Sequence, residues 1–358
     1  MPAVVIGGVP HEMHRLESED MANAYYEFSV RLDPGAYDFY FTYTDADGNT
    51  SSLPSPGSWS GPSVSTVETY IPDFVAVSPD TFLMGNPYPL SPKQERPQHE
   101  VILTNGFYLD RYETTNAQFC NALNWAHDRG VIRVEADTLA MAIASGQPVA
   151  YMAPRRDGVP HGISYATETG FTPYPGREDW PANFVTWFGA ALYCNVRSWW
   201  DGLPAAYDLE AWRIGQFGDP YPAEGWRLPT EAEWEFAAQY NDGRLYPFGS
   251  SIPRPGVDGN FGGVLSHPAP VGSYPQGANA LGVRDMAGNV WEWCHDWYDF
   301  YPAERQTDPW GPRNAINRIL RGGSWGSPAE ELTCFGRFSS RPGSGLSGVG
   351  FRCARRIP

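Results

Sequence analysis

Gly225-Trp-Arg-Leu-Pro-Thr-Glu-Ala-Glu-Trp-Glu235 is the most informative segment of this chain. Thr230 and Glu233 have the spacing of a capping box, in which each side chain accepts a hydrogen bond from the backbone N–H of the other residue. An apolar face follows directly, as in a helix that packs on a core. The segment therefore predicts a helix that begins just after Thr230.

Two further helices are expected upstream of this segment. Residues 113–129 carry apolar residues at helical spacing, and Thr114 or Thr115 can cap their start. Residues 190–200 are expected to form the other helix, after Thr186. Long aperiodic loops separate the helices from short strands. The pattern indicates a loop-rich α+β fold without internal repeats.

The first part of the chain has a strand pattern. Aromatic residues alternate with polar ones over residues 36–44, which is typical of a half-buried strand. Residues 25–32 are expected to pair with it as a hairpin through the turn at Asp33-Pro34-Gly35. Residues 51–63 are rich in Ser, Pro and Gly and are expected to be a linker or a sheet-edge crossover.

A domain boundary is therefore expected near residue 70. Residues 1–70 are expected to form a small β-sandwich-like module, immunoglobulin-like and incomplete, and residues 71–358 the main domain. A module of that size has a small core, so it is expected to depend on the main domain or on a neighbouring molecule.

Composition excludes several classes of function. The chain has 358 residues, with 41 acidic and 25 Lys and Arg side chains, a formal net charge of −16. Nucleic acid is not expected as a partner, because phosphate backbones require a positive surface. The longest uncharged stretches are interrupted by polar residues and proline, so membrane insertion is not expected.

Six motifs occur in one order along residues 72–356. They are Thr81-Phe-Leu-Met-Gly85, Gly106-Phe-Tyr-Leu-Asp-Arg-Tyr-Glu-Thr-Thr115, the Gly225–Glu235 segment, Gly288-Asn-Val-Trp-Glu-Trp293, Arg321-Gly-Gly-Ser-Trp325 and Gly350-Phe-Arg-Cys353. Together they resemble the formylglycine-generating enzyme, or sulfatase-modifying factor, superfamily. The resemblance implies a C-type-lectin-like α+β fold with little regular structure.

The resemblance also locates where the family's oxidase chemistry would be. Members that oxidise cysteine to formylglycine hold copper with two cysteines five residues apart, shortly after the Gly-Gly-Ser-aromatic motif, because Cu(I) prefers soft thiolates. Here Ser327 and Leu332 stand at those two positions, with Cys334 nearby. Copper is therefore not expected. If the chain is an enzyme, its candidate catalytic residues are Ser324, Ser327, Cys334 and Arg337.

Relatives that join sulfur to histidine derivatives use a three-histidine iron site on an additional domain. The seven histidines of this chain show no such motif. His295 is expected to be a structural residue beneath an aromatic cluster, with a role in a cleft as the alternative.

Five cysteines are present. The resemblance implies a disulfide between Cys194 and Cys353, which would close a loop of about 160 residues and stabilise the fold by about 5 kcal/mol. By analogy with bacterial relatives, Cys294 and Cys334 form a second pair. Cys120 is left over, either as a buried thiol or in an intermolecular bond. Because such bridges persist only outside the reducing cytosol, we expect an extracellular, cell-surface or periplasmic location.

A family calcium loop matches residues 285–292. The match assigns the side chains of Asp285 and Glu292 and the carbonyls of Gly288 and Val290 to one structural calcium ion, since Ca²⁺ requires hard oxygen ligands. A second calcium loop would begin at Asn260, but the segment after it lacks the expected Asp.

These observations favour a secreted or surface-displayed, non-catalytic scaffold or binding protein that self-assembles or binds another surface protein or a glycan. Aromatic side chains supply surfaces for stacking if they are exposed, and packing beneath loops is the alternative; they are Trp199, Trp200, Trp291, Trp293, Trp297, Tyr298 and Tyr301. The alternative function is a divergent enzyme of the same superfamily, either a formylglycine-type oxidase or another metal-dependent oxidoreductase.

Overall fold

The computed structural model describes residues 74–136, 138–152 and 162–358 with their side chains, and before residue 65 it describes the backbone of seven strands. The chain forms two compact units, Met1–Pro72 and Asp73–Pro358.

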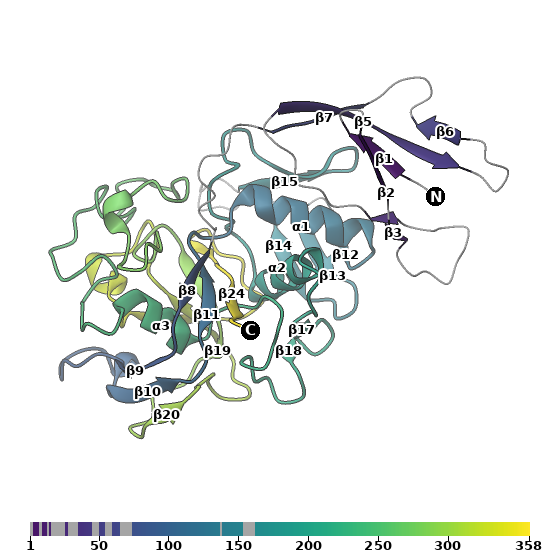
Figure 1. Ribbon diagram of the computed structural model, residues 1–358. Helices are drawn as coiled ribbons and strands as arrows, with labels where there is room; N and C mark the ends of the chain where they lie inside the picture. The colour runs from purple at the N-terminus through teal and green to yellow at the C-terminus, as the bar shows by residue number, and fades with distance from the viewer. Residues whose placement is uncertain are drawn as a thin grey trace. The chain divides into compact units, whose positions relative to one another are not determined.

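The first unit contains a five-stranded sheet (Figure 1). Its longest strand is β5, Gly35–Thr44. Antiparallel partners of β5 are β1 (Ala3–Ile6), β6 (Thr50–Leu53) and β7 (Trp59–Val64), and β2 (Val9–Glu12) continues the sheet beyond β1. The strand expected over residues 36–44 is thus present.

Two expectations for this unit are wrong. Within the described part of the predicted hairpin strand, β4 (Tyr26–Glu27) pairs with β3 (His14–Arg15) and not with β5. Residues 51–63, expected to be irregular, contain most of β6 and β7. The ten residues of β5 offer backbone hydrogen bonds along two edges, and β1, β6 and β7 occupy parts of these edges. The turn residues 33 and 34 lie outside the described residues.

The second unit has three α-helices. They are α1 (Asn116–Asp128), α2 (Trp187–Trp200) and α3 (Glu231–Gln239). The side chains of Thr115 and Thr186 accept hydrogen bonds from the backbone at the starts of α1 and α2. The helix α3 begins where the sequence predicts, and α1 and α2 begin within three residues of their predicted ranges, each after a threonine named as its cap or as preceding it.

Several small sheets surround these helices. Two sheets have three strands each, in the orders β20 (Gln306–Thr307), β10 (His99–Leu103), β9 (Asp80–Met84) and β24 (Ala354–Arg356), β11 (Phe107–Asp110), β8 (Phe74–Val77). A third consists of β12 (Ile132–Glu135), β13 (Leu139–Ala142) and β14 (Pro148–Tyr151). Two hairpins pair β15 (Ile163–Ala166) with β16 (Gly170–Pro173) and β17 (Tyr207–Asp208) with β18 (Arg213–Ile214).

The central sheet of this unit has four strands, in the order β22 (Arg337–Ser340), β21 (Arg318–Arg321), β19 (Trp291–Trp297), β23 (Val349–Gly350). Nearly every residue of β19 and β21 is buried. The sheet carries several of the motif residues described above into the interior. Among the described residues, no helix combines the length and apolar character that crossing a bilayer requires.

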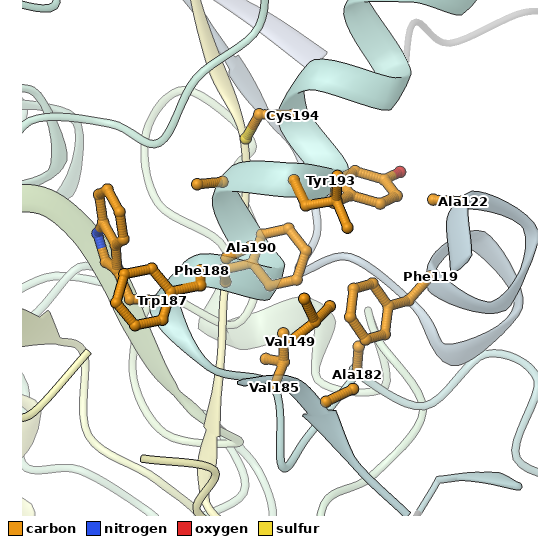
Figure 2. Packing of buried hydrophobic residues seen from close by; sticks show 14 of the residues in the cluster. Phe119, Ala122, Val149, Ala182, Val185, Trp187, Phe188, Ala190, Tyr193 and Cys194 are labelled. Carbon is orange, nitrogen blue, oxygen red and sulfur yellow. The ribbon is translucent and has the colours of Figure 1, made fainter. Parts of the chain in front are cut away.

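Two large apolar clusters make the core. One lies around α1 and α2, where aromatic rings such as Phe119, Trp187 and Tyr193 interlock with small residues (Figure 2). The other packs α3 against β9, β10 and the central sheet (Figure 1). The loops are therefore held by rings packed between them, since the sheets are too short to support them alone.

Candidate functional site

The start of α3 is built as its sequence predicts. The Thr230 hydroxyl accepts a hydrogen bond from Glu233 N at 3.1 Å, and the Glu233 carboxylate accepts one from Thr230 N at 2.8 Å. Both Glu233 oxygens also receive the Arg227 guanidinium, at 2.7 Å each, and both residues are buried. The capping box is thus locked by an ion pair, which fixes where α3 begins.

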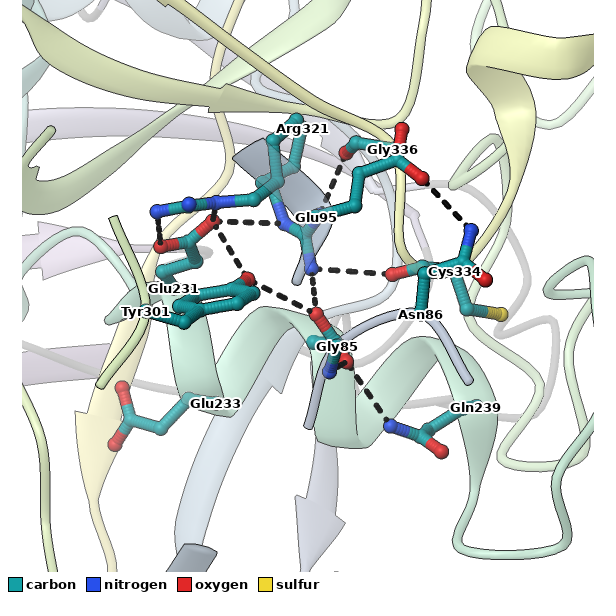
Figure 3. Close-up of polar contacts among 12 residues, drawn as sticks. Gly85, Asn86, Glu95, Glu231, Glu233, Gln239, Tyr301, Arg321, Cys334 and Gly336 are labelled. Atoms are coloured by element: carbon teal, nitrogen blue, oxygen red, sulfur yellow. Dashed lines mark hydrogen bonds and ion pairs between the residues drawn. The ribbon is translucent and has the colours of Figure 1, made fainter. Parts of the chain in front are cut away.

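Three alternate glutamates of α3 point carboxylates into the interior, and two of them meet arginines from the central sheet (Figure 3). Arg337 donates to both Glu231 oxygens, at 2.6 and 2.7 Å. Arg321 bonds Glu235 and the Cys334 carbonyl, and its Nε lies 3.6 Å from Glu231. Buried charges are tolerated only when paired and hydrogen-bonded, as these are.

Neighbouring arginines offset the effect of burial on the pKa more fully for Glu231 than for Glu235. Burial raises the pKa of Glu235 to about 6 despite the opposing effect of Arg321 and of Gly85 N, which donates to it at 2.6 Å. Burial also acts on Glu231, but Arg337 and Arg321 together outweigh it, so the pKa of Glu231 is lowered. Glu231 is therefore charged and fully partnered.

The predicted calcium loop has a different arrangement from the expected one. Glu292 is buried and both its oxygens receive the Arg352 guanidinium at 2.7 Å, while the Trp234 indole donates to one of them. A carboxylate engaged in this way has little left to offer a cation. Asp285 is the better donor, because its Oδ2 accepts one hydrogen bond, from Gly272 N at 2.6 Å.

Further oxygen atoms gather beside this loop. Glu113 accepts hydrogen bonds from Asn289 Nδ2 at 2.6 Å and from Val290 N at 3.1 Å. Burial raises the pKa of Glu113, and the charges of Asp285 and Glu292 raise it further. The buried Oδ1 of Asn260 has no hydrogen-bond partner among the described residues. The donor set of the loop, Asp285 with oxygen atoms around it, suits a hard cation. Calcium here stays a prediction.

Only two of the four candidate catalytic residues lie together. The Ser327 hydroxyl accepts a hydrogen bond from Ser324 N at 3.1 Å, and the two hydroxyl oxygens are 3.5 Å apart. Leu332, at the other copper position, is fully buried against Gly323. Cys334 is buried, and burial raises the pKa of its thiol well above the usual range. These contacts give no activated nucleophile.

Arg337 lies apart from the serine pair and contacts the start of α3 through Glu231. Its guanidinium is held by Glu231 and by the carbonyls of Gln94 and Asp299, and it stacks 3.8 Å from the Tyr301 ring. The structure therefore does not bring the four candidates into one catalytic site.

The cysteines are all free and buried in this structure. The sulfurs of Cys194 and Cys353 lie 3.5 Å apart, within reach of a disulfide but longer than its bond of about 2.05 Å. Cys294 and Cys334 lie in the same core cluster. Burial raises the pKa of the Cys120 thiol to about 12. Both disulfides stay predictions.

The aromatic side chains differ in burial, and Trp297, Tyr298 and Tyr301 are partly buried. Trp291 and Trp293 are buried in the core, whereas Trp199 and Trp200 are 37% and 45% exposed at the end of α2. His295 is buried between the Tyr207 hydroxyl and the Gly218 carbonyl, and burial holds its pKa well below the usual value. Its contacts are those of a structural residue.

A cleft of about 550 Å³ opens at the N-terminal end of α3. Its buried polar residues are His99, from β10, Glu231 and Arg337, and Asp296, from β19. Trp297, Phe300 and Trp310 contribute to its walls. The motifs did not predict this cleft, although Arg337, Trp297 and Tyr301, which line it, were singled out in the sequence. Asp296 is a further local signal, as a carboxylate within a buried strand.

Fold and site together define a loop-rich α+β protein with the C-type-lectin-like fold of formylglycine-generating enzymes. Residues 62–357 match the Sulfatase-modifying factor enzyme 1-like domain, and the chain belongs to that family.

Two kinds of relatives illustrate the family. The formylglycine-generating enzyme of Streptomyces coelicolor is 30% identical over 296 residues, covering 75% of this chain and 83% of that protein. The serine/threonine-protein kinase pkn1 of Chlamydia caviae is 34% identical over 276 residues, covering 74% of this chain but 35% of the relative. The chain thus spans about a third of the kinase relatives' length.

Solved structures show the same fold. Treponema denticola variable protein 1 superimposes with a TM-score of 0.58 at 22% identity, over 79% of this chain and 95% of that one. PvdO from Pseudomonas aeruginosa gives a TM-score of 0.55 at 23% identity, over 79% and 94%. At such identities the likeness concerns the fold.

Proposed function

We propose that this protein is a non-catalytic member of its family, a secreted or surface-displayed scaffold or binding protein. A predicted calcium ion ties its loops, and its partner is a second copy, another surface protein or a glycan. The alternative is a divergent oxidoreductase of the family, and the copper experiment below distinguishes it from a non-catalytic protein.

One observation carries the proposal. At the two positions where oxidase members hold copper, this chain has the Ser327 hydroxyl, which bonds Ser324 N, and the buried side chain of Leu332. A hydroxyl and an aliphatic chain do not replace two thiolates on Cu(I). Cys334 offers one sulfur, which lies in the core.

Copper loading tests this proposal directly. The reduced full chain and the Streptomyces coelicolor enzyme are titrated with Cu(I) against a competing chelator, and each is incubated with a Cys-x-Pro-x-Arg peptide. We expect copper retention and peptide oxidation by the enzyme alone. One tightly held copper per chain, lost in Cys334→Ser, would overturn the proposal, and so would conversion of the peptide.

The predicted disulfides test the location. Protein from an oxidising compartment is digested without reduction and its peptides are identified by mass spectrometry. We expect a peptide pair linking Cys194 to Cys353, because their sulfurs already lie 3.5 Å apart. Fully reduced cysteines in protein exported to a periplasm would argue against it.

Calcium is tested by removal. We expect chelation to lower the melting temperature and added Ca²⁺ to restore it, with Asp285→Asn abolishing the response, because binding to the folded state stabilises by mass action. Exposed Asp128→Asn removes the same charge elsewhere and should leave the response intact. An unchanged melting temperature in chelator would remove calcium from the proposal.

Self-association is the simplest partner to test. Light scattering across a wide concentration range should give a molar mass above the 39.7 kDa of one chain. A strict monomer at the highest concentration would leave another surface protein or a glycan as the partner.

A further inference from the structure

The cleft beside α3 contains a carboxylate oxygen without a hydrogen-bond donor. Asp296 is 4% exposed and lines the cleft, and its Oδ2 accepts a hydrogen bond from Glu231 N at 2.8 Å. Within the described part of the chain, no residue donates to Oδ1. A buried carboxylate with one open oxygen is costly unless a donor approaches from the cleft.

His99 offers a second open acceptor in the same cleft. Its Nδ1 lies 3.2 Å from the Pro97 carbonyl, and since a carbonyl only accepts, Nδ1 carries the proton. Burial lowers the pKa of His99, which keeps the ring neutral. In this tautomer, assigned from the hydrogen-bond network, Nε2 is a bare lone pair. His99 is 5% exposed and lines the cleft.

Of the two arginines that line the cleft, Arg337 is neutralised by Glu231 in a bidentate pair. Arg313 is exposed, and its guanidinium lies 5.0 Å from the Phe217 ring. Two further carboxylates, those of Asp299 and Asp308, line the cleft, while burial raises the pKa of Asp296 well above its usual value. The charges of Asp299 and Asp308 attract a cation, and a cation bound beside Asp296 would favour the ionised form of that carboxyl.

The walls select among cations. Phe300 and Trp310 line the cleft, and the negative faces of aromatic rings attract ammonium and guanidinium groups. Trp297 also lines it, with the Arg318 guanidinium 3.7 Å from its ring. The volume of about 550 Å³ is that of a pocket for a small molecule or one long side chain. A bare metal ion would use neither the rings nor most of this space.

We propose that this cleft binds an organic cation bearing N–H donors, an ammonium or guanidinium group such as that of a lysine or arginine side chain. The cation donates to Asp296 Oδ1 and His99 Nε2 and stacks on the aromatic wall. The inference names a ligand class for the proposed binding role and rests on that role.

The test compares two probes of one shape. Binding of acetyl-arginine amide and of acetyl-citrulline amide to the full chain is measured by calorimetry, because citrulline keeps the outline of arginine without its charge. We expect the arginine probe to bind at least about tenfold more tightly. We also expect Asp296→Asn to abolish this preference, and Asp128→Asn, a matched charge change outside the cleft, to retain it.

A second variant guards against misfolding of the first. Trp310→Ala removes one ring from the wall and leaves both acceptors, and it should weaken arginine binding about three- to tenfold. Equal binding of the two probes, or a preference that survives Asp296→Asn, would overturn the inference. Zn²⁺ binding that depends on Asp296, with neither probe bound, would also overturn it. Copper binding near Ser324 and Ser327 would instead overturn the proposed non-catalytic function. A preference for the arginine probe would then stand without that function.

Discussion

Two kinds of buried carboxylate around α3 differ in their partners. Glu233, Glu235 and Glu292 each have an arginine partner, and all are buried. Asp296, in the cleft, has one backbone donor and, within the described ranges, no arginine bonded to it. Satisfied charges specify a structure, whereas an open buried acceptor is a cost that a ligand can relieve. The comparison separates motif residues that build this fold from residues that can bind.

The largest expected effect concerns the buried carboxylates that have arginine partners. Arg321→Met leaves Glu235 buried without its cation, so we expect a loss of about 3–5 kcal/mol in the free energy of unfolding, measured in urea. Arg133 pairs with Glu135 on the surface, with both side chains nearly half exposed. Arg133→Met should cost about 0–1 kcal/mol. Similar losses in the two variants would contradict the comparison.

The cap of α3 should have the next largest effect. Thr230→Ala removes the acceptor for Glu233 N at a buried helix start, and we expect a loss of about 1–2 kcal/mol in unfolding free energy. Thr115→Ala removes the same group from the more exposed start of α1. It should cost about 0.5–1 kcal/mol. A larger loss for Thr115→Ala would show that burial does not strengthen the cap.

Replacing Asp296, which has no arginine partner among the described residues, should raise the free energy of unfolding. Burial, with Glu231 and Glu233 nearby, raises the pKa of Asp296 well above its usual value, and Arg318 opposes the shift only in part. The unfolded chain therefore loses this proton at lower pH than the folded protein, and stability falls as the pH rises toward the folded pKa.

Asp296→Asn should remove this penalty and keep an acceptor for Glu231 N. We expect a gain of about 1 kcal/mol near pH 8 and no difference near pH 3, from urea unfolding at each pH. If the variant is less stable than the parent at both pH values, the Asp296 carboxylate is as well partnered as Glu233, Glu235 and Glu292.

The serine pair should give a small effect. Ser327→Ala removes one hydrogen bond, from Ser324 N, and we expect a loss of about 0.5–1.5 kcal/mol. Arginine-probe binding should not change. Loss of binding without loss of stability would place the serine pair in the ligand site.

Local features were predictable from the sequence. The Thr230 cap and the α1 and α2 starts depend on residues three apart, so the spacing of side chains in the chain is enough to place them. Six ordered motifs likewise predict the family, which the match over residues 62–357 confirms. The partners of β5 were not predictable, because strand pairing depends on which segments reach its edges in the folded chain.

Sequence alone therefore determined the fold family and the capping residues of the helices, since each follows from residue identity at short spacing. Only the tertiary structure decided that Glu292 belongs to Arg352, that Arg337 belongs to Glu231, and that Asp296 and His99 line one cleft. Asp296 and His99 lie almost two hundred residues apart. Whether a charged group is satisfied depends on what packing brings within hydrogen-bond distance, and that is a property of the folded interior.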